Sequence, residues 1–189
     1  MSKKREEKVD PALGNLLQGI KDYQANHSPE ALESIGNAID QGANSLENLY
    51  FGENPFSLAA RYGLSEVVEL MISKNVDPQK ADSAGMLHFP NGTQIGYAAT
   101  PLHVAVTNKQ PQVAKKLLGY MGCNFNKYHQ ISPLHLAALN QNQNMFQTLL
   151  QDGCDPNAQD FIMGKDAHQW AKDYGGESFS NFNFDGAKE

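Results

Sequence analysis

The sequence predicts an all-α solenoid, in which helix-turn-helix units stack side by side. The first observation is a phrase that occurs twice, 32 residues apart: Thr-Pro-Leu-His-Val-Ala at 100–105 and Ser-Pro-Leu-His-Leu-Ala at 132–137. The second is that each copy leads into another short apolar segment, at 113–118 and 145–150, and then into a glycine turn. Recurrence of one such unit at this period is typical of arrays whose neighbouring units bury a shared core.

Each copy of the phrase predicts the start of a helix. Thr100 and Ser132 are good N-cap residues, because a hydroxyl oxygen accepts a hydrogen bond from a free amide of the first turn. The proline that follows has its φ preset and carries no amide hydrogen, so it suits the first helical position. The second apolar segment predicts the partner helix of each unit.

These residues resemble the ankyrin repeat family. The match is densest at 132–138 (Ser-Pro-Leu-His-Leu-Ala-Ala) and 149–158 (Leu-Leu-Gln-Asp-Gly-Cys-Asp-Pro-Asn-Ala). The family pattern is Thr-Pro-Leu-His-x-Ala, then a leucine pair and a Gly-Ala-Asp-x-Asn-Ala turn. The resemblance implies a solenoid with short β-hairpin loops and a concave binding face. It also implies that His103 and His135 are structural and tie each helix start to neighbouring backbone.

Weaker copies extend the array in both directions. Residues 54–60 and 67–72 predict a helix pair with Asn54 as N-cap, and 166–171 predict a terminal helix with Asp166 as N-cap. Asp10-Pro11 and Ser28-Pro29 predict helices near 11–24 and 29–41. The predicted organisation is a disordered segment 1–9, a repeat domain 10–176 and a tail 177–189. Within the repeat domain we expect an N-terminal cap (10–53), a repeat (54–79), an insertion (80–99), repeats (100–131 and 132–163) and a C-terminal cap (164–176).

The insertion at 80–99 predicts a lengthened β-hairpin, which we call the finger. The N-caps Asn54 and Thr100 are 46 residues apart, about a dozen more than the usual 33. Within the insertion, Pro-Asn-Gly-Thr at 90–93 favours a tight turn, because Asn-Gly tolerates positive φ at both central positions. Residues 86–89 and 93–95 would then pair, and a loop without strands is the alternative.

The cysteines and histidines do not form a recognisable reactive site. Cys123 and Cys154 occupy matching positions of two repeats, where the family usually has alanine, and burial as small apolar side chains explains both. We expect no disulfide, because adjacent helix layers lie roughly 10 Å apart, beyond the reach of a bridge. No zinc-ligand pairs, phosphate loop or nucleophile elbow occurs. The sequence therefore predicts no catalytic residue, no metal and no cofactor.

Composition excludes some classes of partner. The net charge of −6 over 189 residues argues against a nucleic-acid binder, which would need a basic face. No apolar run reaches the length of a membrane span, and residues 1–8 lack the apolar stretch of a secretory signal. We therefore expect a cytoplasmic monomer, with translocation into a host cell without a cleaved signal peptide as the alternative.

The predicted function is non-catalytic protein recognition through the concave face and the finger. Tyrosine is prominent among the expected contact residues, as it is in interface cores. Two alternatives stay open: a bacterial ankyrin effector acting on a host protein after secretion, and an enzyme with an unrecognised site. The predicted partner-binding residues are Tyr50, Phe51, Arg61, Tyr62, Phe89, Tyr97, Asn108, Tyr128, His129, Ile131, Asn140, Met163 and Tyr174.

Two further expectations concern the core and the tail. The tail, with its spaced phenylalanines, either folds back over the last repeat, stays flexible or serves as a short linear motif. The residues expected in the core are Leu58, Ala59, Leu70, Leu102, Ala105, Leu117, Leu118, Leu134, Ala137, Leu149, Leu150 and Trp170.

Overall fold

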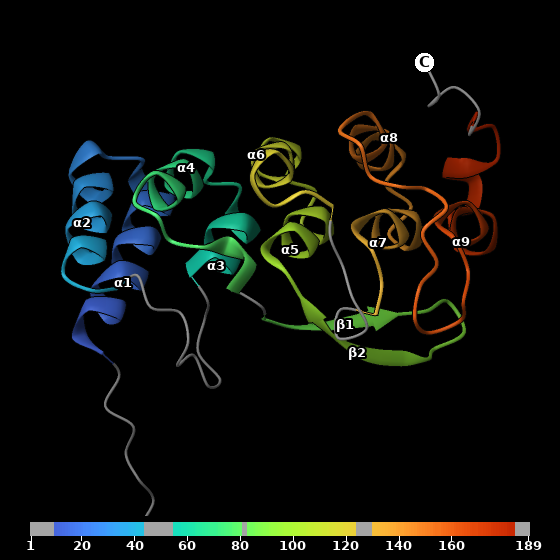
Figure 1. Ribbon diagram of the computed structural model, residues 1–189, viewed down its shortest axis with the longest axis horizontal. Coiled ribbons are helices and arrows are strands. Elements are labelled where there is room, and N and C mark those ends of the chain that lie inside the picture. Colours follow the sequence, from blue (N-terminus) through green and yellow to red (C-terminus); the bar gives the residue numbers. More distant parts are fainter. Residues whose placement is uncertain (1–9, 44–54, 81–82, 124–129, 184–189) are drawn as a thin grey trace, which may run out of the picture.

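The computed structural model describes residues 10–43, 55–80, 83–123 and 130–183. Helices form two layers and one two-stranded sheet lies beneath them (Figure 1). The first layer contains α1 (Pro11–Asn26), α3 (Pro55–Tyr62), α5 (Pro101–Thr107), α7 (Pro133–Leu139) and α9 (Ala167–Tyr174). The second layer contains α2 (Pro29–Asp40), α4 (Ser65–Ser73), α6 (Pro111–Met121) and α8 (Gln143–Gln151). Short 3-10 helices, η1 (Pro78–Lys80) and η2 (Gly176–Phe179), complete the described elements.

Helices α1, α2, α5, α7 and α9 begin where the capping residues predict. Asp10 and Ser28 accept hydrogen bonds from the amides of Ala12 and Ala31 at the starts of α1 and α2. Thr100, Ser132 and Asp166 each form a reciprocal capping box at the starts of α5, α7 and α9. The remaining predicted cap, Asn54, lies outside the described residues.

The stack holds together through contacts between neighbouring units. Within the first layer α3 contacts α5, α5 contacts α7 and α7 contacts α9, and the second layer follows the same order from α2 to α8. The two layers share a continuous core that runs the length of the molecule. The expected core residues are buried except Leu70 and Leu150, which are half-buried on the second layer. The predicted all-α ankyrin-type solenoid is therefore confirmed.

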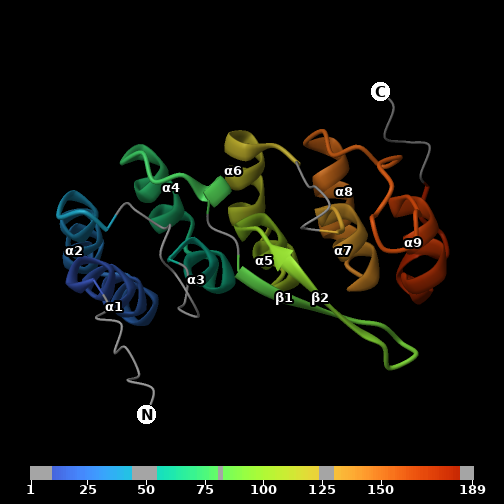
Figure 2. The same ribbon diagram turned by 60° about the horizontal axis from the view of Figure 1, so that its bottom comes forward.

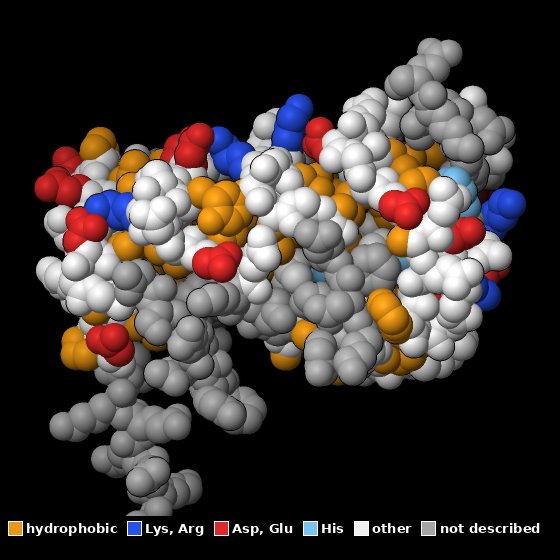
Figure 3. All heavy atoms as spheres, viewed as in Figure 1, with side chains coloured by type: hydrophobic (Ala, Val, Ile, Leu, Met, Phe, Trp, Pro, Cys, Tyr) orange, Lys and Arg blue, Asp and Glu red, His pale blue; other side chains and the backbone are white. Residues whose placement is uncertain are grey.

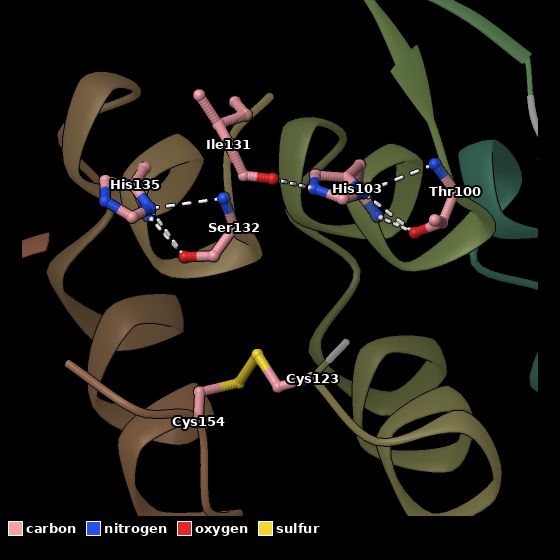
Figure 4. Close-up of a disulfide and its surroundings, with 7 residues drawn as sticks. All are labelled: Thr100, His103, Cys123, Ile131, Ser132, His135 and Cys154. Carbon is pink, nitrogen blue, oxygen red and sulfur yellow. Dashed lines mark hydrogen bonds between the residues drawn. A yellow bond between two sulfur atoms is a disulfide. The ribbon is translucent and has the colours of Figure 1, made fainter. Parts of the chain in front are cut away.

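His103 and His135 each link their own repeat to the unit that follows, as the resemblance implied (Figure 4). The backbone amide of Thr100 donates to Nδ1 of His103, so Nε2 carries the ring hydrogen and donates to the carbonyl oxygen of Ile131, 3.0 Å away. His135 repeats this arrangement with the amide of Ser132 and the carbonyl oxygen of Lys165, also at 3.0 Å. Both rings are fully buried and both ring nitrogens are occupied.

The insertion forms the predicted finger. Strands β1 (Ser83–His88) and β2 (Gln94–Ala99) pair antiparallel, with Leu87 opposite Ile95 and Gly85 opposite Tyr97. The turn differs from the prediction, because only Gly92 has positive φ, at 85°, whereas Asn91 does not. The side chain of Asn91 instead accepts a hydrogen bond from the amide of Thr93, which stabilises a longer turn.

The finger runs along the first layer, from α5 toward α9. It starts beside α5 and its tip reaches α9, as two views show (Figures 1 and 2). Phe89 at the tip is only 7% exposed, and its ring centroid lies 5.5 Å from that of Trp170 and 5.3 Å from that of Tyr174. One face of the finger is therefore buried against the repeats, and the other carries the exposed side chains of Met86, His88 and Gln94.

The described part of the tail folds back over the last repeat. Phe179, in η2, is buried, and its ring centroid lies 5.1 Å from that of Phe146 in α8. Phe182 contacts the same ring at 5.5 Å. Of the three interpretations of the tail, the described residues support the one in which it folds back over the last repeat.

The prediction that no disulfide forms is wrong. Cys123 and Cys154 are disulfide-bonded, with their Cα atoms 5.2 Å apart (Figure 4). The spacing of about 10 Å applies to packed helix axes, whereas both cysteines lie in turns that follow a helix. Gly122 and Gly153 adopt positive φ at these turns, and there the chains of the two repeats approach each other.

Candidate functional site

The structure divides the predicted binding residues into three groups. Arg61, Tyr62, Asn108 and Met163 are exposed, and Asn140 and Tyr174 are half-buried. Phe89, Tyr97 and Ile131 are buried. The remaining predicted residues, Tyr50, Phe51, Tyr128 and His129, lie outside the described residues.

The three buried residues are structural, and their assignment to a binding surface is corrected. Phe89 packs on Trp170 and Tyr174. Ile131 is fully buried, and its own carbonyl oxygen accepts the hydrogen bond from His103. Tyr97 contacts the ring of His103 edge-to-face at 5.7 Å. Burial raises the pKa of Tyr97 to about 12, and a hydrogen bond with Thr107 opposes this shift. Family register placed Tyr97 and Ile131 at hairpin tips, and Phe89 was predicted as a contact residue of the finger. Phe89 is buried because it packs on α9.

Four accessible positions recur at the ends of the first-layer helices. Tyr62 and Tyr174 are the last residues of α3 and α9, and Asn108 and Asn140 are the C-caps of α5 and α7. Consecutive repeats are linked beside these positions, where the side-chain amide of Gln110 donates to the carbonyl oxygen of Arg61, 3.3 Å away. The side chain of Gln141 donates in the same way to Tyr174 at 3.4 Å. These two hydrogen bonds therefore fix the backbone at the ends of α3 and α9, where Tyr62 and Tyr174 lie.

A buried carboxylate shapes the loop before α9. Asp160 is 4% exposed and accepts hydrogen bonds from the amides of Ile162, Met163 and Lys165 and from the indole Nε1 of Trp170. Burial alone would raise the pKa of Asp160, but these hydrogen bonds outweigh it and lower the pKa. A single side chain thus closes the loop and fixes it to α9.

Two exposed apolar residues were missed by the sequence analysis. Phe161, in the loop that Asp160 closes, is 59% exposed, and Met86, on the outer face of the finger, is 51% exposed. Strict alternation along β1 was the available signal for Met86, because its neighbours Gly85 and Leu87 face the repeats. Phe161 precedes the predicted Met163 by two residues, and no local pattern distinguishes its outward direction.

The buried histidines form structural hydrogen bonds. His103 and His135 have both ring nitrogens in hydrogen bonds and are buried, so neither is positioned to move a proton of a substrate. Burial lowers the pKa of His135, although its bond to Lys165 and the charges of Asp160 and Asp166 act in the opposite direction. Over the described ranges, no three His, Cys, Asp or Glu side chains are grouped to hold a metal ion.

A shallow polar groove between α1 and α2 contains none of the predicted residues. It is about 290 Å³ in volume and is lined by residues such as Asn15, Asp22, Glu30 and Asn37. Elsewhere on the surface, acidic and basic side chains are interspersed along the second layer (Figure 3). On this face of the described residues, the mixture of acidic and basic side chains agrees with the modest net charge of −6.

Comparison with known proteins places this geometry in a family. The model of the family "Ankyrin repeats (3 copies)" matches residues 23–127 and 83–160, which together cover most of the chain. The chain belongs to the ankyrin repeat family. Ankyrin repeats are generally protein–protein interaction modules, and the family is generally non-catalytic.

Curated relatives share only this module with the chain. Neurogenic locus notch homolog protein 1 of Mus musculus is 30% identical over 157 residues, covering 81% of this chain and 6% of that protein. Transient receptor potential cation channel subfamily V member 5 of Mus musculus is 29% identical over 148 residues, covering 72% of this chain and 18% of that protein. The chain thus spans less than a fifth of either relative. Among the described residues, no helix has the length and apolarity required to cross a membrane.

Proposed function

We propose that this ankyrin repeat chain is a non-catalytic module that binds a partner protein along the open side of its first layer. The contact residues are Arg61, Tyr62 and Asn108, with the outer face of the finger beside them. Asn140, Met163 and Tyr174 extend this surface toward α9. Tyr50, Phe51, Tyr128 and His129 remain predicted contributors.

The observation that carries the proposal is the exposure of Tyr62. Its side chain is 42% exposed at the end of α3, in the part of the first layer that precedes the finger (Figure 1). Tyrosine offers a large contact area with few rotatable bonds, and it is enriched among the residues that dominate binding energy. Arg61 precedes Tyr62 in the chain and is also exposed. Arginine, like tyrosine, is enriched in interfaces.

The finger contributes a second surface that the repeats themselves do not provide. Its inner face is anchored by Phe89, so the outer face, with Met86 and His88, is held on a fixed support. A surface fixed before binding loses little conformational entropy when a partner docks. The finger therefore acts as part of the binding surface, and it also packs on α9 through Phe89.

The experiment compares two tyrosines with similar exposure on different layers. Tyr62→Ala is tested against Tyr120→Ala, because Tyr120 is 47% exposed but lies in α6 of the second layer. Immobilised full-length chain is incubated with an extract of its native cell, and captured proteins are quantified by mass spectrometry. We expect at least a ten-fold loss of the partner with Tyr62→Ala, since truncation of a dominant contact costs about 2 kcal/mol or more.

The control decides whether the first layer is the binding side. Tyr120→Ala should retain the partner at the wild-type level, and both variants should melt within a few degrees of wild type. Equal capture by Tyr62→Ala and wild type would refute the proposed surface. Loss of capture only in Tyr120→Ala would assign binding to the second layer.

A further inference from the structure

The disulfide joins two neighbouring repeats at equivalent positions. Cys123 follows α6 and Cys154 follows α8, and 31 residues of sequence separate them. Figure 4 shows the bridge between the two units, on the side away from the histidine and N-cap contacts of α5 and α7. The bond therefore supplements a set of histidine hydrogen bonds that already links successive repeats.

The two cysteines differ in their access to solvent. Cys154 is 3% exposed and its amide donates to the carbonyl oxygen of Leu149, 2.9 Å away, which holds the turn against α8. Cys123 is only partly buried at the edge of the core. Thiol–disulfide exchange requires a thiolate to approach a sulfur atom in line, so access determines which cysteine meets an external reagent.

We propose that Cys123 and Cys154 form a thiol–disulfide exchange site with fixed roles. Cys123 is the residue that reacts with an external small disulfide, of which oxidised glutathione is the example, and Cys154 is the resolving residue. This site is independent of the proposed binding surface, because neither cysteine contributes to it.

The chemistry proceeds in two balanced steps. The Cys123 thiolate attacks one sulfur of oxidised glutathione, the glutathione disulfide breaks, and one glutathione leaves as a thiolate while the other remains bonded to Cys123. The Cys154 thiolate then attacks the Cys123 sulfur, forms the Cys123–Cys154 bond and releases the second glutathione thiolate. Overall, two protein thiols lose two protons and two electrons, and one glutathione disulfide is reduced to two glutathiones.

The first experiment measures closure and its effect on the wild-type chain. Reduced full-length protein is incubated with oxidised glutathione, quenched with acid and analysed by mass spectrometry. We expect a final product that has lost two hydrogens and carries no glutathione. Closure of a loop of this size should raise the melting midpoint by roughly 5–15 °C. A product that retains glutathione, or one that forms no internal bond, would overturn the proposal.

Matched variants test the two roles. Cys154→Ala should accumulate one glutathione on Cys123, whereas folded Cys123→Ala should leave Cys154 at least ten-fold less modified over the same time. Both variants should react equally in denaturing urea, because the difference arises from burial. Circular dichroism confirms that each variant is folded, and Cys→Ser changes replace any that is not. Equal modification of the two folded variants would refute the assigned roles.

Discussion

At the scale of single residues, His135 illustrates how a buried side chain makes stability depend on pH. Its Nδ1 accepts hydrogen bonds from the backbone amide and hydroxyl of Ser132, and its Nε2 donates to Lys165. These partners require the neutral ring. Burial lowers the pKa of His135 from its ordinary value of 6.5, so the unfolded chain takes up a proton at a higher pH than the folded chain does.

The direction of the pH effect follows from this difference. Between the lowered folded pKa of His135 and 6.5, the unfolded state binds more protons. The free energy of unfolding therefore falls as the pH decreases below about 6.5, and it is independent of this group at higher pH. Urea denaturation at several pH values between about 7.5 and 5 measures the trend.

His135→Gln should flatten that profile. Glutamine suits this third helical position, since Gln169 completes the same capping box at the start of α9, where its side-chain oxygen accepts from Asp166. The variant loses the bond to Lys165 and should be less stable at pH 7.5 by about 1 kcal/mol. His88→Gln, at an exposed position of β1, is the control and should keep the wild-type profile. An unchanged profile in His135→Gln would show that another group causes the acid sensitivity.

The cysteines mark a limit of sequence-based prediction at this scale. The N-caps were predictable, because Thr100, Ser132 and Asp166 act within one turn of their own helices. The histidine bonds to the next unit were expected only because the resemblance to the ankyrin family implied them. The disulfide depends on how closely two turns approach in space, and a mean helix spacing does not describe turns. With the Cα atoms of Cys123 and Cys154 5.2 Å apart, the local path of the chain decides the outcome.

At the scale of elements, the finger combines a predictable strand pairing with an unpredictable position. The excess spacing between the N-caps Asn54 and Thr100 and the turn residues at 90–93 can be seen in the sequence, and they identified the hairpin. Its docking depends on Phe89 meeting Trp170 and Tyr174, which lie far along the chain. Gly85 also matters, because a Cβ at that position would lie 2.5 Å from the ring of Tyr97. No pattern in the sequence links these residues.

Docking of the finger can be observed through the single tryptophan. Trp170 is the only tryptophan in the chain and is fully buried, with Phe89 against its ring. Phe89→Ala removes that contact and should lower the free energy of unfolding by about 3–5 kcal/mol. Trp170 emission should shift to longer wavelength, and quenching by acrylamide should increase.

A variant on the other face of the finger is the matched control. Met86→Ala changes a residue that is 51% exposed, so the emission and quenching of Trp170 should remain as in wild type. If Phe89→Ala also left the emission and quenching unchanged, the finger would not be docked on α9 in solution.

At the scale of the whole molecule, the disulfide bears on where the protein works. Disulfides persist in oxidising compartments and are usually transient in the cytosol. Cytoplasmic residence stays a prediction, as does translocation into a host cell. A persistent Cys123–Cys154 bond in protein isolated under thiol-blocking conditions would favour an oxidising compartment.

The stack also departs from a simple chain of nearest neighbours. In most repeat proteins each unit contacts only the adjacent ones. Here the finger joins α5 directly at the end of β2, and its Phe89 packs on α9. It therefore connects two units that are separated by the repeat of α7 and α8. The Cys123–Cys154 bond lies within the same part of the chain. Helices α1 and α2 lie outside this span, and α1 reaches the rest of the stack mainly through α3.

Unfolding should therefore proceed in two parts, with α1 and α2 separating first. Leu16 in α1 and Leu134 in α7 are both fully buried, and substitution of either by alanine should cost about 2–5 kcal/mol. Leu134→Ala lies within the part spanned by the finger and should move the urea midpoint of Trp170 fluorescence to lower concentration. Leu16→Ala should shift only the early phase of far-ultraviolet circular dichroism, because its unit is coupled to Trp170 through successive neighbours alone. Equal displacement of the Trp170 midpoint by the two variants would mean that the whole solenoid unfolds as one unit, and that the finger adds no separate coupling between its ends.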